Sequence, residues 1–172
     1  RENPKVGLVN IGAEASKGST LTKAAYELLE QSKMNFIGNV EAREVPEGAC
    51  DVIVTDGFTG NVLLKLTEGM ALNILKLLKK KFTEGTKAKL GAALLIDKIR
   101  DIKQDFDYSE YGGAPILGVR GPIVKMHGSS NANAVKNTII KGIPYAEEKV
   151  VDIIQNSVLE IEEITLSEHD RF

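Results

Sequence analysis

Three segments of this chain repeat one pattern: an apolar run of strand length, a polar turn containing glycine, and then residues with helical spacing. The apolar runs are residues 5–11, 51–55 and 121–124. Continuous apolar runs are typical of strands that are buried on both faces of a parallel sheet. Because right-handed strand–helix–strand connections build such sheets, the pattern predicts an α/β fold with a mostly parallel sheet flanked by helices.

The turns after the second and third runs carry residues that suit an anion. Asp56-Gly-Phe-Thr-Gly-Asn61 comes before one helical pattern, and His127-Gly-Ser-Ser130 comes before another that we expect to begin near Ser129. Glycine allows close approach of the backbone, and a helix N-terminus presents N–H groups with a partial positive charge. In open α/β sheets the ligand crevice lies at the carboxyl ends of the strands. Ordinary turns with helix caps are the alternative.

The spacing of apolar residues between these turns predicts the remaining elements. A further short strand is expected at 35–38, and residues 105–117 are expected to form a loop in which Tyr108 and Tyr111 pack. Ser19 is a suitable N-cap for the first helix, and Gly142 and Pro144 are expected to separate the last two. The predicted helices begin after Ser19, run from 61 to about 84, from 87 to 103 and from 129 to 140, and begin again at Pro144.

The composition fits a globular protein, with 42% hydrophobic residues and a net charge of −2. The one cysteine, Cys50, excludes an internal disulfide and a thiolate zinc cluster, and we expect it to pack in the core. Two distant histidines do not form a histidine metal motif, so we expect neither a metal nor a cofactor. The chain begins at Arg1 without a methionine, and we expect it to be a piece of a longer polypeptide.

Residues 76–103 form a basic amphipathic segment, in which nine basic residues stand against three acidic ones. A basic helical face on an otherwise acidic chain favours an anionic membrane surface or an acidic protein as partner, and not a nucleic acid. The alternative is a solvated helical face that packs on its own domain. The residues expected to enter the membrane interface are Leu90, Leu94, Leu95 and Ile99.

Several motifs together resemble one family, PlsX, the bacterial acyl-acyl-carrier-protein:phosphate acyltransferases of phospholipid synthesis. The similarity runs over residues 3–165 and corresponds to the C-terminal half of the family's longer chain. The motifs that carry it are Val6-Gly-Leu-Val-Asn-Ile-Gly12 with Lys17-Gly18, Asn35-Phe-Ile-Gly-Asn-Val-Glu-Ala-Arg43, Asp51-Val-Ile-Val-Thr-Asp-Gly-Phe-Thr-Gly-Asn61, Tyr111-Gly-Gly-Ala114 and His127-Gly-Ser-Ser130.

The resemblance implies a fold of the isocitrate/isopropylmalate dehydrogenase type, in which residues 1–172 form the C-terminal part of a single domain. It implies attack of inorganic phosphate on the acyl thioester of acyl carrier protein, which gives acyl phosphate. It further implies a cytoplasmic homodimer that associates peripherally with the membrane. The acyl phosphate would then serve a glycerol-3-phosphate acyltransferase in the membrane.

The chemistry needs cations and N–H donors around the phosphate and the thioester carbonyl, but no side-chain nucleophile. We expect Lys17 and Lys125 to add charge, His127 to donate to the oxyanion or the leaving sulfur, and Asp56 to orient a neighbour or accept a proton. Each of these residues has a structural alternative: a surface charge for the lysines, a hydrogen-bonded structural role for His127, and a cap of the next turn for Asp56. Asn61 can equally be the N-cap of the helix that follows it. The predicted catalytic residues are His127, Lys17 and Asp56, and the predicted phosphate- or substrate-binding residues are Gly57, Thr59, Gly60, Asn61, Lys125, Gly128, Ser129 and Ser130.

Three other functions stay open. A nicotinamide dehydrogenase of the same fold type would need a dinucleotide fingerprint or a metal-binding aspartate cluster, and the sequence has neither. A short-chain phosphotransacetylase would have no evident use for the basic segment 76–103. A non-catalytic membrane-binding module is the third.

Overall fold

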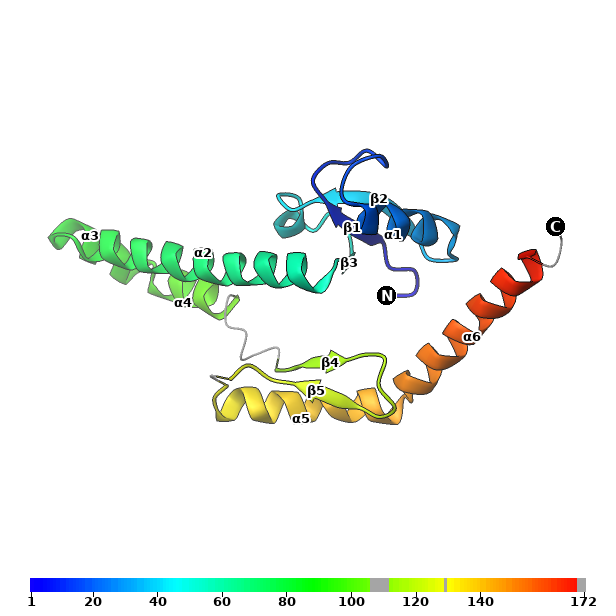
Figure 1. Ribbon diagram of the computed structural model, residues 1–172. Helices are drawn as coiled ribbons and strands as arrows, with labels where there is room; N and C mark the ends of the chain where they lie inside the picture. Colours follow the sequence, from blue (N-terminus) through cyan, green and yellow to red (C-terminus); the bar gives the residue numbers. More distant parts are fainter. Residues whose placement is uncertain (106–111, 129, 170–172) are drawn as a thin grey trace. The chain divides into compact units, whose positions relative to one another are not determined.

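A computed structural model describes residues 1–105, 112–128 and 130–169, with only the backbone described for 103–105 and 160–169. The chain divides into two compact units, Arg1–Lys79 (unit 1) and Lys80–Phe172 (unit 2), which are described separately below (Figure 1). That the two units belong to a single domain stays a prediction.

Unit 1 is built on a three-stranded parallel sheet. Its strands are β1 (Val6–Asn10), β2 (Phe36–Glu41) and β3 (Val52–Val54), in the order β2-β1-β3. Helix α1 (Thr20–Gln31) connects β1 to β2, and the short 3-10 helix η1 (Val45–Glu47) lies before β3. The α/β class and the parallel pairing predicted from the apolar runs are confirmed for this sheet.

The core of unit 1 lies around β1, which is central in the sheet and buried along its whole length. Leu8 is 2% exposed, and Val40 on β2 is 3% exposed. Tyr26 of α1 packs edge-to-face on Phe36 of β2, with ring centroids 5.2 Å apart. Ser19 caps α1 as predicted, because its Oγ accepts a hydrogen bond from the backbone N–H of Thr22.

The long helix α2 spans Gly57–Thr83 and begins four residues earlier than the sequence predicted. Residues 57–61 are therefore the first turn of the helix and not a turn before it. Asn61 lies inside the helix, so its alternative role as N-cap is wrong. Asp56 starts the helix instead, because its carboxylate accepts hydrogen bonds from the N–H groups of Phe58 and Thr59.

The predicted single helix over 87–103 is wrong, because the structure has two helices there. Helix α3 spans Thr86–Leu94, and helix α4 spans Ile96–Asp105. Leu95 separates them, and its N–H bonds to the carbonyls of Gly91 and Ala92 as the last turn of α3 tightens. The apolar residues on either side of Leu95 therefore do not form one continuous helical face.

Unit 2 also contains an antiparallel pair of strands, of which the sequence predicted only the second, from the apolar run 121–124. Strand β4 (Ala114–Ile116) pairs with β5 (Ile123–Lys125), and β5 is not part of the three-stranded sheet. The loop predicted over 105–117 is therefore wrong at 114–116, where β4 lies. Residues 106–111, which include Tyr108 and Tyr111, lie outside the described part of the chain. A three-residue strand with proline at its centre gives almost no sequence signal.

Helix α5 (Ala132–Glu147) packs on this antiparallel pair, and α6 (Val150–His169) follows it. Ala134 and Thr138 of α5 are buried, and a Cβ on Gly113 would lie only 2.7 Å from the carbonyl oxygen of Lys125. The predicted helix end at Gly142 is wrong, since α5 continues through Pro144. Glycine lowers helix propensity there but does not end the helix, and a Cβ at residue 142 would make an ordinary contact, 3.6 Å from the Val124 side chain.

Candidate functional site

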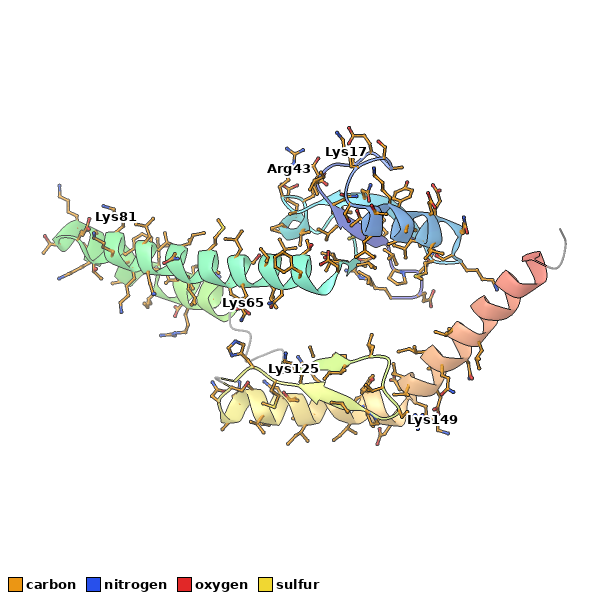
Figure 2. The ribbon with its side chains drawn as sticks, viewed as in Figure 1. Lys17, Arg43, Lys65, Lys81, Lys125 and Lys149 are labelled. Atoms are coloured by element: carbon orange, nitrogen blue, oxygen red, sulfur yellow. The ribbon has the colours of Figure 1, made fainter. Side chains whose placement is uncertain are left out.

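The carboxyl ends of the three parallel strands of unit 1 meet at one edge of the sheet. Lys17 lies in the loop after β1, Arg43 follows β2, and Asp56 follows β3. Figure 2 shows Lys17 and Arg43 at the rim of unit 1. This edge is where ligands bind in open α/β sheets, so the predicted residues of unit 1 gather at the expected place.

Lys17 presents its ammonium group at this edge. Its side chain is 48% exposed, and its Nζ lies 3.9 Å from the Oε1 of Glu14. The loop is folded back on itself, because the backbone N–H of Lys17 donates to the carbonyl of Glu14 at 3.0 Å. A long ion pair between half-exposed groups contributes little energy, so an incoming anion can compete with Glu14 for the ammonium group.

Asp56 acts as the cap of α2. Its Oδ1 accepts hydrogen bonds from the N–H of Phe58 at 2.9 Å and of Thr59 at 2.8 Å. Hydrogen bonds from the Thr59 side chain and backbone, with that from Phe58, lower the pKa of Asp56 below its ordinary value. Because hydrogen bonding favours its charged form, Asp56 is a weak base at neutral pH. The structure therefore supports its capping alternative.

The other predicted residues of unit 1 lie in the first turn of α2. Gly57, Thr59 and Asn61 are exposed there, and Gly60 is half-buried. A Cβ on Gly60 would lie 2.6 Å from the Cγ2 of Thr55, so glycine lets the helix begin close to the end of β3. Close packing accounts for Gly60 without any ligand.

In unit 2 the remaining candidates lie between β5 and α5. Lys125 ends β5, and His127 and Gly128 follow it, all three exposed. The N–H of Ser130 donates to the carbonyl of His127 at 3.1 Å. Ser129 lies outside the described residues. Helix α5 begins at Ala132 rather than near Ser129, because Asn131 is its N-cap and accepts from the N–H of Ala134 at 2.9 Å.

The two groups of residues do not follow strands of one sheet. The sequence predicts one mostly parallel sheet that includes the apolar run 121–124, but this prediction is wrong, because β5 pairs with β4 in a separate sheet. Lys17 and Asp56 lie at one edge within unit 1, and Lys125, His127 and Ser130 lie together within unit 2. That all of them line one pocket stays a prediction.

Sequence reasoning missed Arg43. Its Nε lies 3.0 Å from the Oε2 of Glu41, and its side chain is exposed. The signal was present, because Arg43 follows the end of a strand predicted to lie in the same parallel sheet as the strand before Lys17. The edge therefore carries two cations rather than one.

A hollow of unit 1 lies at the opposite edge of the sheet, where the strands begin. It has a volume of about 580 Å³ and is lined by Arg1, Pro4, Gly48, Cys50, Asp51 and Val52. Arg1 and Asp51 form an ion pair in it. Cys50 packs over Gly7, because a Cβ added at residue 7 would lie 2.9 Å from the thiol sulfur. This contact agrees with a packing role for the half-buried Cys50.

The predicted membrane residues belong to both helices of the broken pair. Leu90, Leu94 and Leu95 are 68%, 82% and 51% exposed, while Ile99 of α4 is half-buried. On α4, Lys98 and Arg100 have acidic partners three residues away, Asp101 and Asp97. The most exposed of the four predicted residues lie on α3 and at its end, and α4 adds Ile96 and Ile102, which are 49% and 44% exposed.

Among the side chains that the structure describes, in 1–102, 112–128 and 130–159, no three or more from histidine, cysteine or acidic residues come together as metal ligands would. Over the same ranges, no helix has both the length and the apolar content needed to cross a bilayer.

Comparison with known proteins decides the family. The family described as "Fatty acid synthesis protein" matches residues 1–152. The chain belongs to this family. It is 50% identical over 160 residues to the phosphate acyltransferase of Clostridium acetobutylicum, covering 93% of this chain and 48% of that protein. It is 49% identical over 169 residues to the phosphate acyltransferase of Clostridioides difficile, covering 98% of this chain and 50% of that protein. It is 52% identical over 157 residues to the phosphate acyltransferase of Alkaliphilus oremlandii, covering 91% of this chain and 47% of that protein.

The resemblance found in the motifs is thus confirmed at the level of the fatty acid synthesis protein family. The chain spans about half the length of the curated relatives that it matches. Those relatives are named for transfer of an acyl group to phosphate. What the complete protein does with this half is therefore a matter for proposal.

Proposed function

We propose that the complete protein transfers a long-chain acyl group from the thioester of acyl carrier protein to inorganic phosphate. The observation that carries this proposal is the carboxyl edge of unit 1, where Lys17 and Arg43 stand at the ends of adjacent parallel strands. Membership of a family whose curated members are named phosphate acyltransferases supports phosphate as the anion bound there.

The proposed reaction needs no nucleophile from the protein. A phosphate oxygen attacks the thioester carbonyl carbon, and the carbonyl oxygen becomes an oxyanion in the tetrahedral intermediate. The carbon–sulfur bond then breaks, which leaves acyl phosphate and a thiolate that takes up a proton. The protein has to hold phosphate against the carbonyl and stabilise the oxyanion, and no cofactor enters.

The residues divide between these tasks. Lys17 binds the phosphate by charge, and Arg43, with its planar fork of donors, can hold a second phosphate oxygen. His127 donates to the oxyanion or protonates the leaving sulfur, and Lys125, Gly128, Ser129 and Ser130 bind phosphate or substrate. Asp56 keeps the first turn of α2 in place, so that Gly57, Thr59 and Asn61 face the substrate.

The experiment is turnover of a long-chain acyl-acyl-carrier-protein with phosphate by the complete protein. Loss of one preorganised donor costs about 10²–10³ in rate, and we expect Lys17→Ala and His127→Ala each to lose that much. Lys33→Ala is the matched control, because Lys33 is an exposed lysine that lies before β2, at the other edge of the sheet. Near-normal turnover by both variants would refute the site, and turnover of acetyl thioesters alone would favour a short-chain phosphotransacetylase.

We further propose that the complete protein meets an anionic membrane surface through α3. The supporting observation is the exposure of Leu90 and Leu94 beside Lys87 and Lys89 on the same helix. Basic residues near such a surface contribute on the order of 1 kcal/mol each. Docking there would bring acyl phosphate to a membrane glycerol-3-phosphate acyltransferase.

The family resemblance supports two further parts of the proposal. The complete protein is a cytoplasmic homodimer in which α2 is an interface element, and its fold is of the isocitrate/isopropylmalate dehydrogenase type.

Flotation with anionic vesicles tests the membrane contact. Leu94→Glu should release the complete protein from the vesicles, because a carboxylate replaces a leucine that is 82% exposed. Leu28→Glu on α1, where the leucine is 70% exposed, is the matched control and should float like the parent protein. Equal flotation of both variants would show that α3 does not touch the membrane.

A further inference from the structure

We propose that Asn10 and Asn39 are positioning residues that hold the loop carrying Lys17, and that a bulge in β2 exists to bring them together. This inference rests on the proposed function of Lys17. Neither asparagine touches the candidate phosphate position itself. Both lie inside the sheet of unit 1, where Asn10 is 7% and Asn39 is 8% exposed.

The two amides are joined to each other and to the loop. The Nδ2 of Asn10 donates to the Oδ1 of Asn39 at 3.1 Å and to the carbonyl of Lys17 at 3.1 Å. The Nδ2 of Asn39 donates to the carbonyl of Glu14 at 2.9 Å, and the Oδ1 of Asn10 accepts from the N–H of Ile11 at 2.8 Å. The loop is thus bound at its start, its middle and at Lys17.

This arrangement depends on one extra residue in β2. The pairing advances from Val6↔Phe36 to Leu8↔Asn39, so three residues of β2 oppose two of β1. Gly38 lies in the bulge with φ +92°, a conformation that favours glycine. Side chains paired across neighbouring strands point to the same face, as do residues two apart along a strand. Asn39 therefore shares the face of Leu8 and Asn10.

Without the bulge the two amides would lie on opposite faces. Continuing the register from Val6↔Phe36 would pair Val9 with Asn39, and a slip of one residue exchanges the faces of every later side chain. Asn39 would then point away from Asn10, and the carbonyl of Glu14 would lose its donor. The bulge therefore places the Asn39 side chain on the face of the sheet where it can donate to the loop of residues 11–18.

Two glycines close the loop onto these amides. Gly18 has φ +92°, and a Cβ there would collide with the Asn10 amide and the Thr22 hydroxyl. A Cβ on Gly12 would lie 2.8 Å from the Oε2 of Glu14 and 3.2 Å from the Cγ of Lys17. The loop can therefore lie tightly over Asn10 while Lys17 remains at the rim.

A purely structural role does not explain why these two positions are polar. The neighbouring buried positions on the same strands are Leu8, Val9 and Val40, and an apolar pair would fill the interior equally well. Buried amides stabilise a fold only when they are hydrogen-bonded, and here their bonds go to each other and to the main chain of residues 11–17. Their placement serves the loop.

The first test uses the complete protein and a double-mutant cycle on kcat/KM for phosphate. We expect Asn39→Ala to lower it by roughly 10- to 100-fold, since small misplacement of a positioning group costs that much. In a Lys17→Ala background the same change should lower it by less than about 3-fold further, because the two act as a unit. Asn35→Ala is the control, because the Asn35 side chain, just before β2, donates to the carbonyl of Asn3 and not to the loop. This variant should leave kcat/KM unchanged.

A second readout does not depend on activity. Amide hydrogen exchange over residues 11–18 should become faster in Asn39→Ala and stay unchanged in Asn35→Ala and Lys17→Ala. Unchanged exchange in Asn39→Ala would overturn the positioning role even if Lys17 proves essential. Additive losses in the cycle would overturn it as well. If Lys17→Ala leaves kcat/KM unchanged, that result would instead refute the role of Lys17 in the proposed function, and there would be no reason to position it.

Discussion

The two units hold their candidate residues in different ways. In unit 1 the loop with Lys17 is tied by buried amides to the interior of a parallel sheet, whose central strand is buried throughout. In unit 2 the segment with His127 lies between β5 and the Asn131 cap of α5, and within it the N–H of Ser130 donates to the carbonyl of His127. The loop of unit 1 is thus fixed by side chains from the sheet interior, while the segment of unit 2 is bounded by a strand and a helix cap.

The buried residues differ in the same way. Unit 1 buries branched apolar side chains such as Leu8 and Val40 around β1. The described part of unit 2 buries the small residues Ala134 and Thr138, and Thr138 lies against Gly112 and Gly113. Unit 1 should therefore be sensitive to lost volume, and unit 2 to added volume. Two substitutions test this difference, and a third tests the cap of α2.

The largest effect should come from removing volume in unit 1. Leu8→Ala leaves a cavity beside the central strand and should lower the free energy of unfolding by about 2–5 kcal/mol. Denaturant unfolding of the complete protein measures it, with Leu28→Ala as the control on an exposed leucine of α1. Similar losses for both variants would show that β1 is not the centre of the core.

A smaller effect should come from adding volume in unit 2. Gly113→Ala places a methyl group 2.7 Å from the Lys125 carbonyl oxygen and from the Cγ1 of Val124, and overpacking of this kind costs about 1–3 kcal/mol. Gly121→Ala is the control, because a Cβ there meets nothing within 4 Å. If both variants unfold alike, α5 and the β4–β5 pair do not pack as described.

The smallest effect should be the pH dependence of the α2 cap. Because the folded pKa of Asp56 lies below its ordinary value, its stabilisation is present above the unfolded pKa and is lost as the pH falls through the folded one. The loss should therefore develop below roughly pH 4. Asp56→Asn keeps a capping oxygen but does not titrate, so thermal unfolding of this variant should lose that part of the acid sensitivity. An unchanged acid profile would contradict the cap.

Sequence reasoning succeeded where a local pattern sufficed. The apolar runs predicted β1 and β3, and Ser19 predicted the start of α1. It failed where pairing between distant segments decides, because the short strand β4 forms by pairing with β5. It also missed the break between α3 and α4 at Leu95 and the continuation of α5 past Gly142.

The candidate site shows the same limit. Lys17 and Asp56 were found as polar residues after apolar strands, which is a pattern along the chain. The Asn10–Asn39 pair needs the register of two strands and the extra residue at Gly38, which single-strand spacing does not contain. Such residues emerge only when neighbouring strands are placed side by side.

The central claim is that the carboxyl edge of the unit 1 sheet binds phosphate through Lys17. Titration calorimetry of inorganic phosphate into the complete protein tests it most directly, by comparing the parent protein, Lys17→Ala and Lys33→Ala. The account predicts that Lys17→Ala weakens phosphate binding by at least about 10-fold, in line with loss of a charged hydrogen bond, while Lys33→Ala binds as the parent does. Equal affinity in all three proteins would contradict it.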